Sequence, residues 1–88
     1  MAAPDGSGTA DPIKAVVEVV ARALVDHPDA VRVTENDRRG TMVYSLTTAP
    51  GDMGKIIGRQ GRTAAAFRTL VALTAEKHGM RAQLDIKD

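Results

Sequence analysis

The twelve residues DMGKIIGRQGRT, positions 52–63, carry the most informative pattern in this 88-residue chain. Gly58 and Gly61 stand three positions apart, with branched aliphatic residues before them and arginine inside and after them. Glycine lacks a Cβ, so the backbone can turn tightly and a ligand can approach its N–H groups closely. A helix expected to begin near Arg62 would direct free N–H groups and the positive end of its dipole to the same place. We therefore predict a phosphate-binding loop between two helices.

The charge distribution supports a polyanionic ligand for this loop. The formal net charge of +1 conceals a segment, residues 53–75, that holds four basic residues and no acidic one, whereas the rest of the chain has eight basic and eleven acidic residues. A locally positive segment is where a polyanion would bind. The candidate contact residues are Lys55, Ile56, Ile57, Gly58, Arg59, Gln60, Gly61 and Arg62.

These residue types predict that phosphate and nucleobases would be contacted by different parts of the site. The loop backbone with Arg59 and Arg62 would hold phosphate, and an aliphatic groove beside it would hold unstacked bases. Ile56 and Ile57 cannot both face that groove, so at least one of them is expected to pack in the core. Tyr44 and Phe67 are the only aromatic residues, so recognition by rows of stacked aromatic rings is excluded.

The segment before the loop predicts a helix and a hairpin. Asp11-Pro12 is a typical helix start, and the helix is expected to end near His27-Pro28. Its expected buried face consists of Ile13, Val16, Val17, Val20, Leu24 and Val25. Two strands then follow, one around Val31–Thr34 and one over Met42–Thr48, joined by the polar connection Asn36–Gly40.

The remaining elements are a short helix, a long helix and a strand. Asp52 is expected to stabilise the first turn of the short helix. The long helix begins at Arg62, ends near His78 and is capped by Gly79 in a left-handed conformation. Its expected buried face consists of Thr63, Phe67, Leu70, Val71 and Thr74. With a last strand over Arg81–Lys87, we predict an α+β fold of order αββααβ, in which three helices pack on one face of a three-stranded sheet.

Several function classes are disfavoured by what the sequence lacks. It has no cysteine, which excludes disulfides, thiolate nucleophiles and cysteine-based zinc sites. His27 and His78 lie in no metal or catalytic spacing, and we predict neither a metal nor a cofactor. Gly54-Lys55 is followed by Ile56 rather than by serine or threonine, so a nucleotide-binding phosphate loop is not expected. No membrane-spanning run or leader is apparent, residues 1–10 are predicted to be a disordered tail, and a cytoplasmic location is expected.

The element order and the GXXG loop resemble the type II KH domain, and the span from Asp11 to Ile86 is similar to the KhpA family of small bacterial stand-alone KH proteins. The resemblance implies a KH domain over residues 11–88 that binds single-stranded RNA without catalysis. It also implies a role as an RNA chaperone or post-transcriptional regulator, and dimerisation or pairing with a larger KhpB-like KH protein. One residue departs from the family pattern, because Ala64 replaces a branched aliphatic residue and predicts a shallower groove.

A second candidate surface lies on the long helix, outside its expected buried face. Ala65, Ala66, Thr69 and Leu73 form a small, weakly polar strip that is either helix-favouring composition or a dimer surface. If the strip is the functional surface, the chain would be a protein-interaction adaptor with weak or no RNA affinity. The arginines in the loop favour RNA binding over this alternative.

Overall fold

A computed structural model describes the chain from residue 11 to residue 87. The predicted tail, residues 1–10, and Asp88 lie outside the described residues. Helix α2 (Pro12–Leu24) begins where the sequence predicts, because Oδ1 of Asp11 accepts a hydrogen bond from the Lys14 N–H at 3.0 Å. It ends at Leu24, earlier than expected. Pro28 disfavours helical geometry at the preceding residue, His27. The N–H of His27 is bonded to the Asp52 carboxylate instead of to a helix carbonyl.

Three strands form one mixed sheet in the order β1-β2-β3. Strand β1 (Arg32–Arg38) pairs antiparallel with β2 (Thr41–Thr47), and β2 pairs parallel with β3 (Arg81–Lys87). The connection in the hairpin is shorter than predicted, since β1 extends to Arg38 and only Arg39 and Gly40 turn, with φ of 54° and 90°. Positive φ at both central residues is the geometry of a two-residue hairpin turn.

The loop lies between α3 (Met53–Ile57) and α4 (Arg62–Lys77), with a short 3₁₀ segment, Arg59–Gly61, between them. The predicted left-handed cap of α4 is confirmed, because Gly79 has a φ of 67°. The N–H of Met80 donates to the carbonyl of Ala75 at 2.8 Å and closes the end of the helix.

The buried faces of the two long helices agree in part with the predicted ones, since Ile13, Val17, Val25, Phe67 and Val71 are buried. Leu24 and Leu70, both expected inside, are 37% and 43% exposed. Alanine occupies inward positions of both helices, which lets the helices lie close to the sheet and leaves bulkier neighbours at the margin. Helix α2 buries Ile13, Val17 and Ala21, and α4 buries Ala64, Phe67, Val71 and Ala75.

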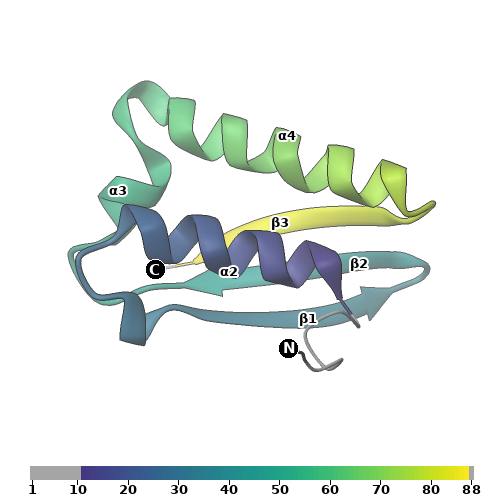
Figure 1. Ribbon diagram of the computed structural model, residues 1–88, viewed down its shortest axis with the longest axis horizontal. Coiled ribbons are helices and arrows are strands. Elements are labelled where there is room, and N and C mark those ends of the chain that lie inside the picture. The colour runs from purple at the N-terminus through teal and green to yellow at the C-terminus, as the bar shows by residue number, and fades with distance from the viewer. Residues whose placement is uncertain (1–10, 88) are drawn as a thin grey trace, which may run out of the picture.

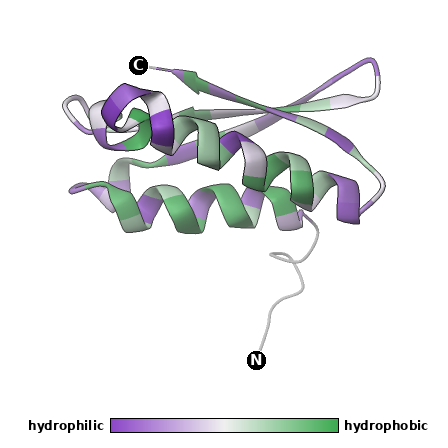
Figure 2. Ribbon diagram, turned by 90° about the horizontal axis from the view of Figure 1, so that it is seen from above, coloured by the Kyte–Doolittle hydropathy of each residue, from purple (hydrophilic) through white to green (hydrophobic). Residues whose placement is uncertain are grey.

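Helices α2 and α4 lie side by side on one face of the sheet, and the other face is free of helices among residues 11–87 (Figures 1 and 2). The predicted α+β class and three-stranded sheet are confirmed. The five-residue α3 packs against the two long helices at one end of the molecule and contributes the fully buried Ile56 to the core. Within the described residues, no helix is long and apolar enough to cross a bilayer.

Candidate nucleic-acid interface

The GXXG loop is a tight turn built from left-handed backbone. Gly58, Gln60 and Gly61 have φ of 75°, 58° and 72°. The N–H of Gly61 donates to the carbonyl of Gly58 at 3.1 Å, and the N–H of Gly58 closes α3 on the carbonyl of Gly54 at 2.8 Å. No side chain caps the first turn of α4. The N–H of Arg62 is bonded to the carbonyl of Arg59, so the N–H groups that follow it in that turn are the ones available for an anion.

The two glycines of the loop serve different purposes. A Cβ added to Gly58 would lie 2.6 Å from Cβ of Thr63 and would overlap its hydroxyl. A Cβ added to Gly61 would meet nothing within 4 Å. Gly58 is therefore required for packing as well as for its φ, whereas Gly61 is required for its φ and leaves the outer side of the loop open to a ligand.

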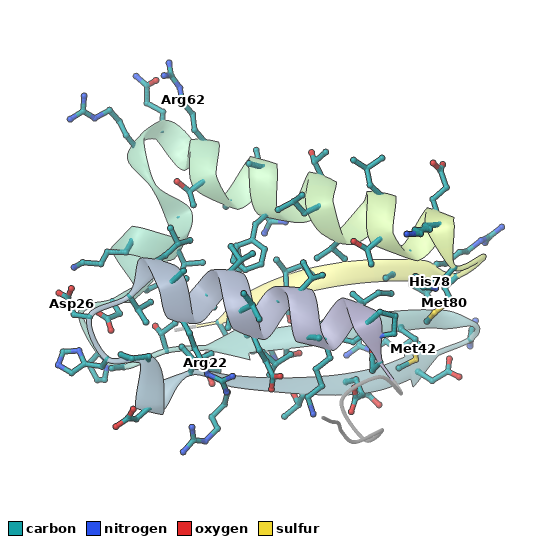
Figure 3. All side chains as sticks on the ribbon, viewed as in Figure 1. Arg22, Asp26, Met42, Arg62, His78 and Met80 are labelled. Atoms are coloured by element: carbon teal, nitrogen blue, oxygen red, sulfur yellow. The ribbon has the colours of Figure 1, made fainter. Side chains whose placement is uncertain are left out.

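The side chains that project from the loop are exposed and basic. Arg59, Gln60 and Arg62 are all exposed, and Arg62 points away from the body of the protein (Figure 3). Neither arginine takes part in any ion pair formed within residues 11–87. Their charges are thus uncompensated by nearby carboxylates and remain available to phosphate.

Lys55 and the two isoleucines differ in availability from the loop arginines. The Nζ of Lys55 lies 3.2 Å from Oδ2 of Asp26 and 4.0 Å from Oδ1 of Asp52, so it is less free to bind a ligand. Ile56 is fully buried and Ile57 is 41% exposed. Ile56 is therefore the isoleucine that packs in the core, its side chain leaves the set of candidate contacts, and Ile57 alone offers an aliphatic surface beside the loop.

The Asp52 side chain ties the start of α3 to the segment that follows α2. It makes no side-chain capping hydrogen bond, and the predicted effect of its charge on the first turn of α3 stays a prediction. Its Oδ2 accepts a hydrogen bond from the His27 N–H at 3.0 Å and lies 3.2 Å from His27 Nδ1. At 2% exposure it is the one buried charged residue in the described chain. The connection between α2 and β1 is thereby tied to the start of α3.

The electrostatics of this anchor favour the ionised carboxylate. Burial alone would raise the pKa of Asp52, but hydrogen bonds donated by the backbone and imidazole of His27 and by the backbone of Asp26 outweigh it and lower the pKa. The carboxylate is therefore charged at neutral pH, where it accepts these hydrogen bonds most strongly.

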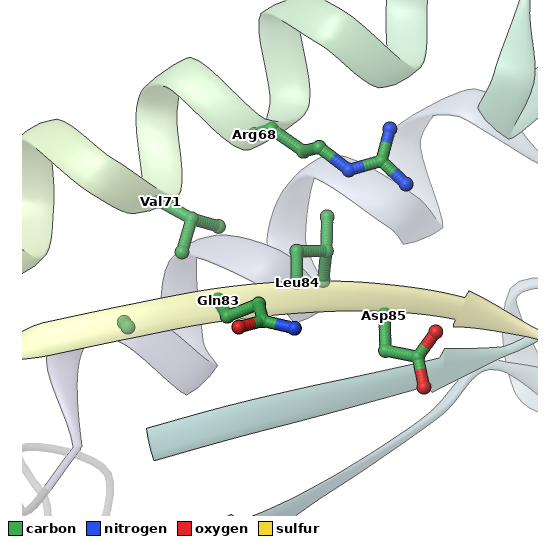
Figure 4. A pocket seen from close by; sticks show the side chains of 6 residues that line it. Arg68, Val71, Gln83, Leu84 and Asp85 are labelled. Atoms are coloured by element: carbon green, nitrogen blue, oxygen red, sulfur yellow. The ribbon is translucent and has the colours of Figure 1, made fainter. Parts of the chain in front are cut away.

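A cleft of about 480 Å³ lies between α4 and the edge strand β3 (Figure 4). Both faces of β3 contribute to it, because Leu84 and Ala82 belong to the helix-facing side and Gln83 and Asp85 to the opposite side. The cleft is lined by Arg68, Val71, Ala82, Gln83, Leu84 and Asp85. Sequence reasoning missed Gln83 and Asp85, since nothing local indicates that the last strand runs beside α4.

The predicted strip on α4 is exposed along its length. Ala65, Ala66, Thr69 and Leu73 are exposed, Leu73 by 57%. The hydroxyl of Thr69 donates to the carbonyl of Ala65 at 3.1 Å, which makes its outer surface less polar. Leu70 adds to this apolar surface. Whether a second protein covers the strip stays a prediction.

Metal binding and base stacking find no support in residues 11–87. No group of three or more His, Cys, Asp or Glu side chains is placed to hold a metal ion there. Tyr44 and Phe67 are 0% and 1% exposed, so neither ring can stack on a base. The features that fit the predicted chemistry are a turn with exposed arginines and a cleft with polar and aliphatic walls.

Together, a two-glycine loop between helices and a mixed three-stranded sheet define a KH-type domain. The model of the KhpA/KhpB KH domain matches residues 14–86. The RNA-binding protein KhpA of Halalkalibacterium halodurans is 51% identical over 76 residues, which cover 86% of this chain and 100% of that protein. The proteins of the same name from Caldanaerobacter subterraneus and Aquifex aeolicus are 48% and 45% identical, over 81% and 84% of this chain and 95% and 94% of their own lengths. The chain belongs to the KhpA/KhpB family of KH domains.

Proposed function

We propose that this protein binds single-stranded RNA without catalysis, through a KH domain that spans residues 11–88. The observation that carries the proposal is the loop itself, in which left-handed backbone at Gly58, Gln60 and Gly61 meets an uncapped helix start and two unpaired arginines. Phosphate needs N–H donors and positive charge at one point. The relatives named RNA-binding protein KhpA support RNA as the polyanion.

Phosphate and base contacts are divided between two places. The N–H groups at the start of α4, with Arg59 and Arg62, hold the backbone of about four nucleotides, the length that a GXXG loop clamps. The α4–β3 cleft receives the bases, because the Asp85 carboxylate can accept hydrogen bonds from base amino groups and the Arg68 guanidinium can donate to base acceptors. Gln83 can both donate and accept. Ile57 supplies apolar contact.

The role in the cell is proposed to be that of a cytoplasmic RNA chaperone or post-transcriptional regulator acting as a dimer. One small groove gives limited affinity, and a second linked domain raises avidity. The partner would be a second copy of the chain or a KhpB-like KH protein, docked on the strip of Ala65, Ala66, Thr69 and Leu73. A protein-interaction adaptor is the second candidate, and the 57% exposure of Leu73 is the observation that favours it.

Competition binding tests the proposal. A labelled single-stranded RNA is bound to the protein, fluorescence anisotropy is recorded, and unlabelled RNAs of equal length compete as a single strand or as a perfect duplex. We expect the single strand to compete at least about tenfold better, because paired bases cannot enter the cleft. Equal competition by the duplex would contradict the proposal, and absence of binding to either RNA would favour the adaptor.

A further inference from the structure

The sheet face that no helix covers has a charge pattern that the sequence conceals. Tyr44, Leu46 and Leu84 point into the core, so the alternate residues of each strand form the opposite, open face. The strand register arranges this open face in four rows across the sheet. The rows are Arg38–Thr41–Arg81, Asn36–Val43–Gln83, Thr34–Ser45–Asp85 and Arg32–Thr47–Lys87.

Each of the two outer rows has a basic residue on both edge strands and a threonine between them. The four basic residues therefore occupy the corners of the open face, and Asp85 is its one acidic residue. From the spacing between strands, the two basic residues of a row are about 10 Å apart. From the rise per residue along a strand, the two outer rows are roughly 20 Å apart. The dimensions suit several successive phosphates of one strand.

The acidic residues of β1 lie on the other face. Glu35 is in register with the core residue Tyr44, and its Oε1 lies 3.7 Å from Nζ of Lys14 on α2. Asp37 shares this helix-facing side. The alternation of side chains along β1 thus places its basic residues on one face of the sheet and its acidic residues on the other. The open face is therefore positive, although the chain as a whole is nearly neutral.

The chemistry of the open face fits a nucleic acid better than a protein. Its one apolar residue, Val43, is 5% exposed, so the face offers no apolar centre of the kind that protein interfaces bury. Threonine, serine, asparagine and glutamine side chains fill the space between the basic corners. Such groups hydrogen-bond to phosphate and ribose hydroxyls without reading sequence.

The open face is also continuous with the α4–β3 cleft. Gln83 and Asp85 belong to the open face by register and line the cleft at the same time (Figure 4). Strand β3 is an edge strand, so no neighbouring strand separates the two surfaces. An RNA strand that leaves the cleft reaches the open face by crossing the edge of β3.

We propose, building on the proposed function, that the open face of the sheet is a second contact surface for single-stranded RNA. It holds the sugar–phosphate backbone of nucleotides that flank those bound by the loop and the cleft. Arg38 and Arg81 carry most of this contact. They form no ion pair within the described chain, whereas Lys87 lies 3.7 Å from Asp85 and Arg32 donates to the carbonyls of Asp29 and Val31.

The test compares Arg38→Gln/Arg81→Gln with a control of equal charge, Arg22→Gln/Lys77→Gln, whose substitutions lie on the helices. Both are titrated by anisotropy with RNAs of about 4 and about 12 nucleotides, the shorter being the length that the loop clamps. We expect the open-face variant to bind the short RNA as wild type does. Its affinity for the long RNA should fall about five- to tenfold, and the slope of log affinity against log salt should become shallower by about 1.4, for two lost phosphate contacts.

The remaining outcomes separate this surface from the loop. If wild type binds both RNAs and the two double variants bind the long RNA alike, the open face is not a contact surface and the proposal is overturned, while the proposed function stands. If wild type binds neither RNA, both are overturned. A variant that changes sedimentation but not RNA affinity would assign the face to a protein partner and would also overturn the proposal.

Discussion

The loop end of the molecule and the outer surface of its long helices have opposite chemistry. At the loop, Arg59 and Arg62 project without carboxylate partners and the backbone is held in left-handed geometry. On the helices, Val19, Leu70 and Leu73 are 67%, 43% and 57% exposed. A charged turn suits a polyanion, and an exposed apolar surface suits another protein. We therefore expect that mutation can separate the proposed RNA binding from the proposed assembly.

The largest expected effect is a charge reversal in the loop. Arg59→Asp/Gln60→Asp should weaken RNA binding about a hundredfold, because unit charges near 4 Å repel by about 1 to 4 kcal/mol each. Self-association should be unchanged, and the melting temperature should barely move because both positions are exposed. Anisotropy measures the affinity. Arg22→Asp/Ala23→Asp makes the same change of charge on α2, and an RNA affinity that falls equally there would contradict the loop assignment.

Replacing each glycine of the loop by alanine should destabilise the protein to a different extent. Gly58→Ala combines positive φ with overlap of Thr63 and should cost about 2 to 3 kcal/mol of unfolding free energy. Gly61→Ala meets only the backbone penalty, about 1 kcal/mol. Chemical denaturation measures both. Equal losses would show that Thr63 moves aside and that Gly58 is needed only for its φ.

On the helix surface, Leu73→Glu should weaken self-association or pairing at least about tenfold, because association would bury a charge. Binding of a short RNA should stay the same. Val19→Glu introduces the same group at another exposed apolar position, on α2, and serves as the control. Sedimentation velocity measures association. If Val19→Glu dissociates the protein and Leu73→Glu does not, the partner docks on α2 rather than on the strip.

The hydrogen bonds between Asp52 and His27 should make the stability of the fold depend on pH. The pKa of Asp52 is lower in the folded protein than its ordinary value of about 3.9, so its ionisation stabilises the fold fully above that value. This contribution is lost as the pH falls through the lower folded pKa. Asp52→Asn should therefore lower the melting temperature at pH 7 and differ progressively less from wild type in acid. Asp26→Asn, which removes only an exposed ion pair, should change little at any pH.

The smallest expected effect is on salt dependence. Arg62→Ala should make the slope of log affinity against log salt shallower by about 0.7, the value for one phosphate contact of a single strand. The change should be alike for RNAs of different sequence, since a phosphate contact carries no base information. Arg22→Ala, another exposed arginine, should leave the slope unchanged. If Arg62→Ala alters sequence preference and not the slope, Arg62 contacts bases.

Local features of the chain were predictable because neighbouring residues encode them. The cap at Asp11, the left-handed Gly79 and the two-glycine turn follow from backbone and side-chain preferences within a few residues. The face of each long helix was less predictable. Periodicity favours bulky aliphatic residues such as Leu70, but the distance between helix and sheet places alanines inward and leaves Leu70 at the margin.

By itself, the sequence determined the class of the fold and the position of the two-glycine loop, because both depend on short-range patterns. Only the tertiary structure decided which of Ile56 and Ile57 is buried, and that the Asp52 carboxylate is tied to His27, 25 residues away in the chain. The same holds for the cleft at Gln83 and Asp85 and for the basic corners of the open face. Strand pairing and helix packing bring these residues together from distant segments, so their proximity cannot be predicted from any local pattern in the sequence.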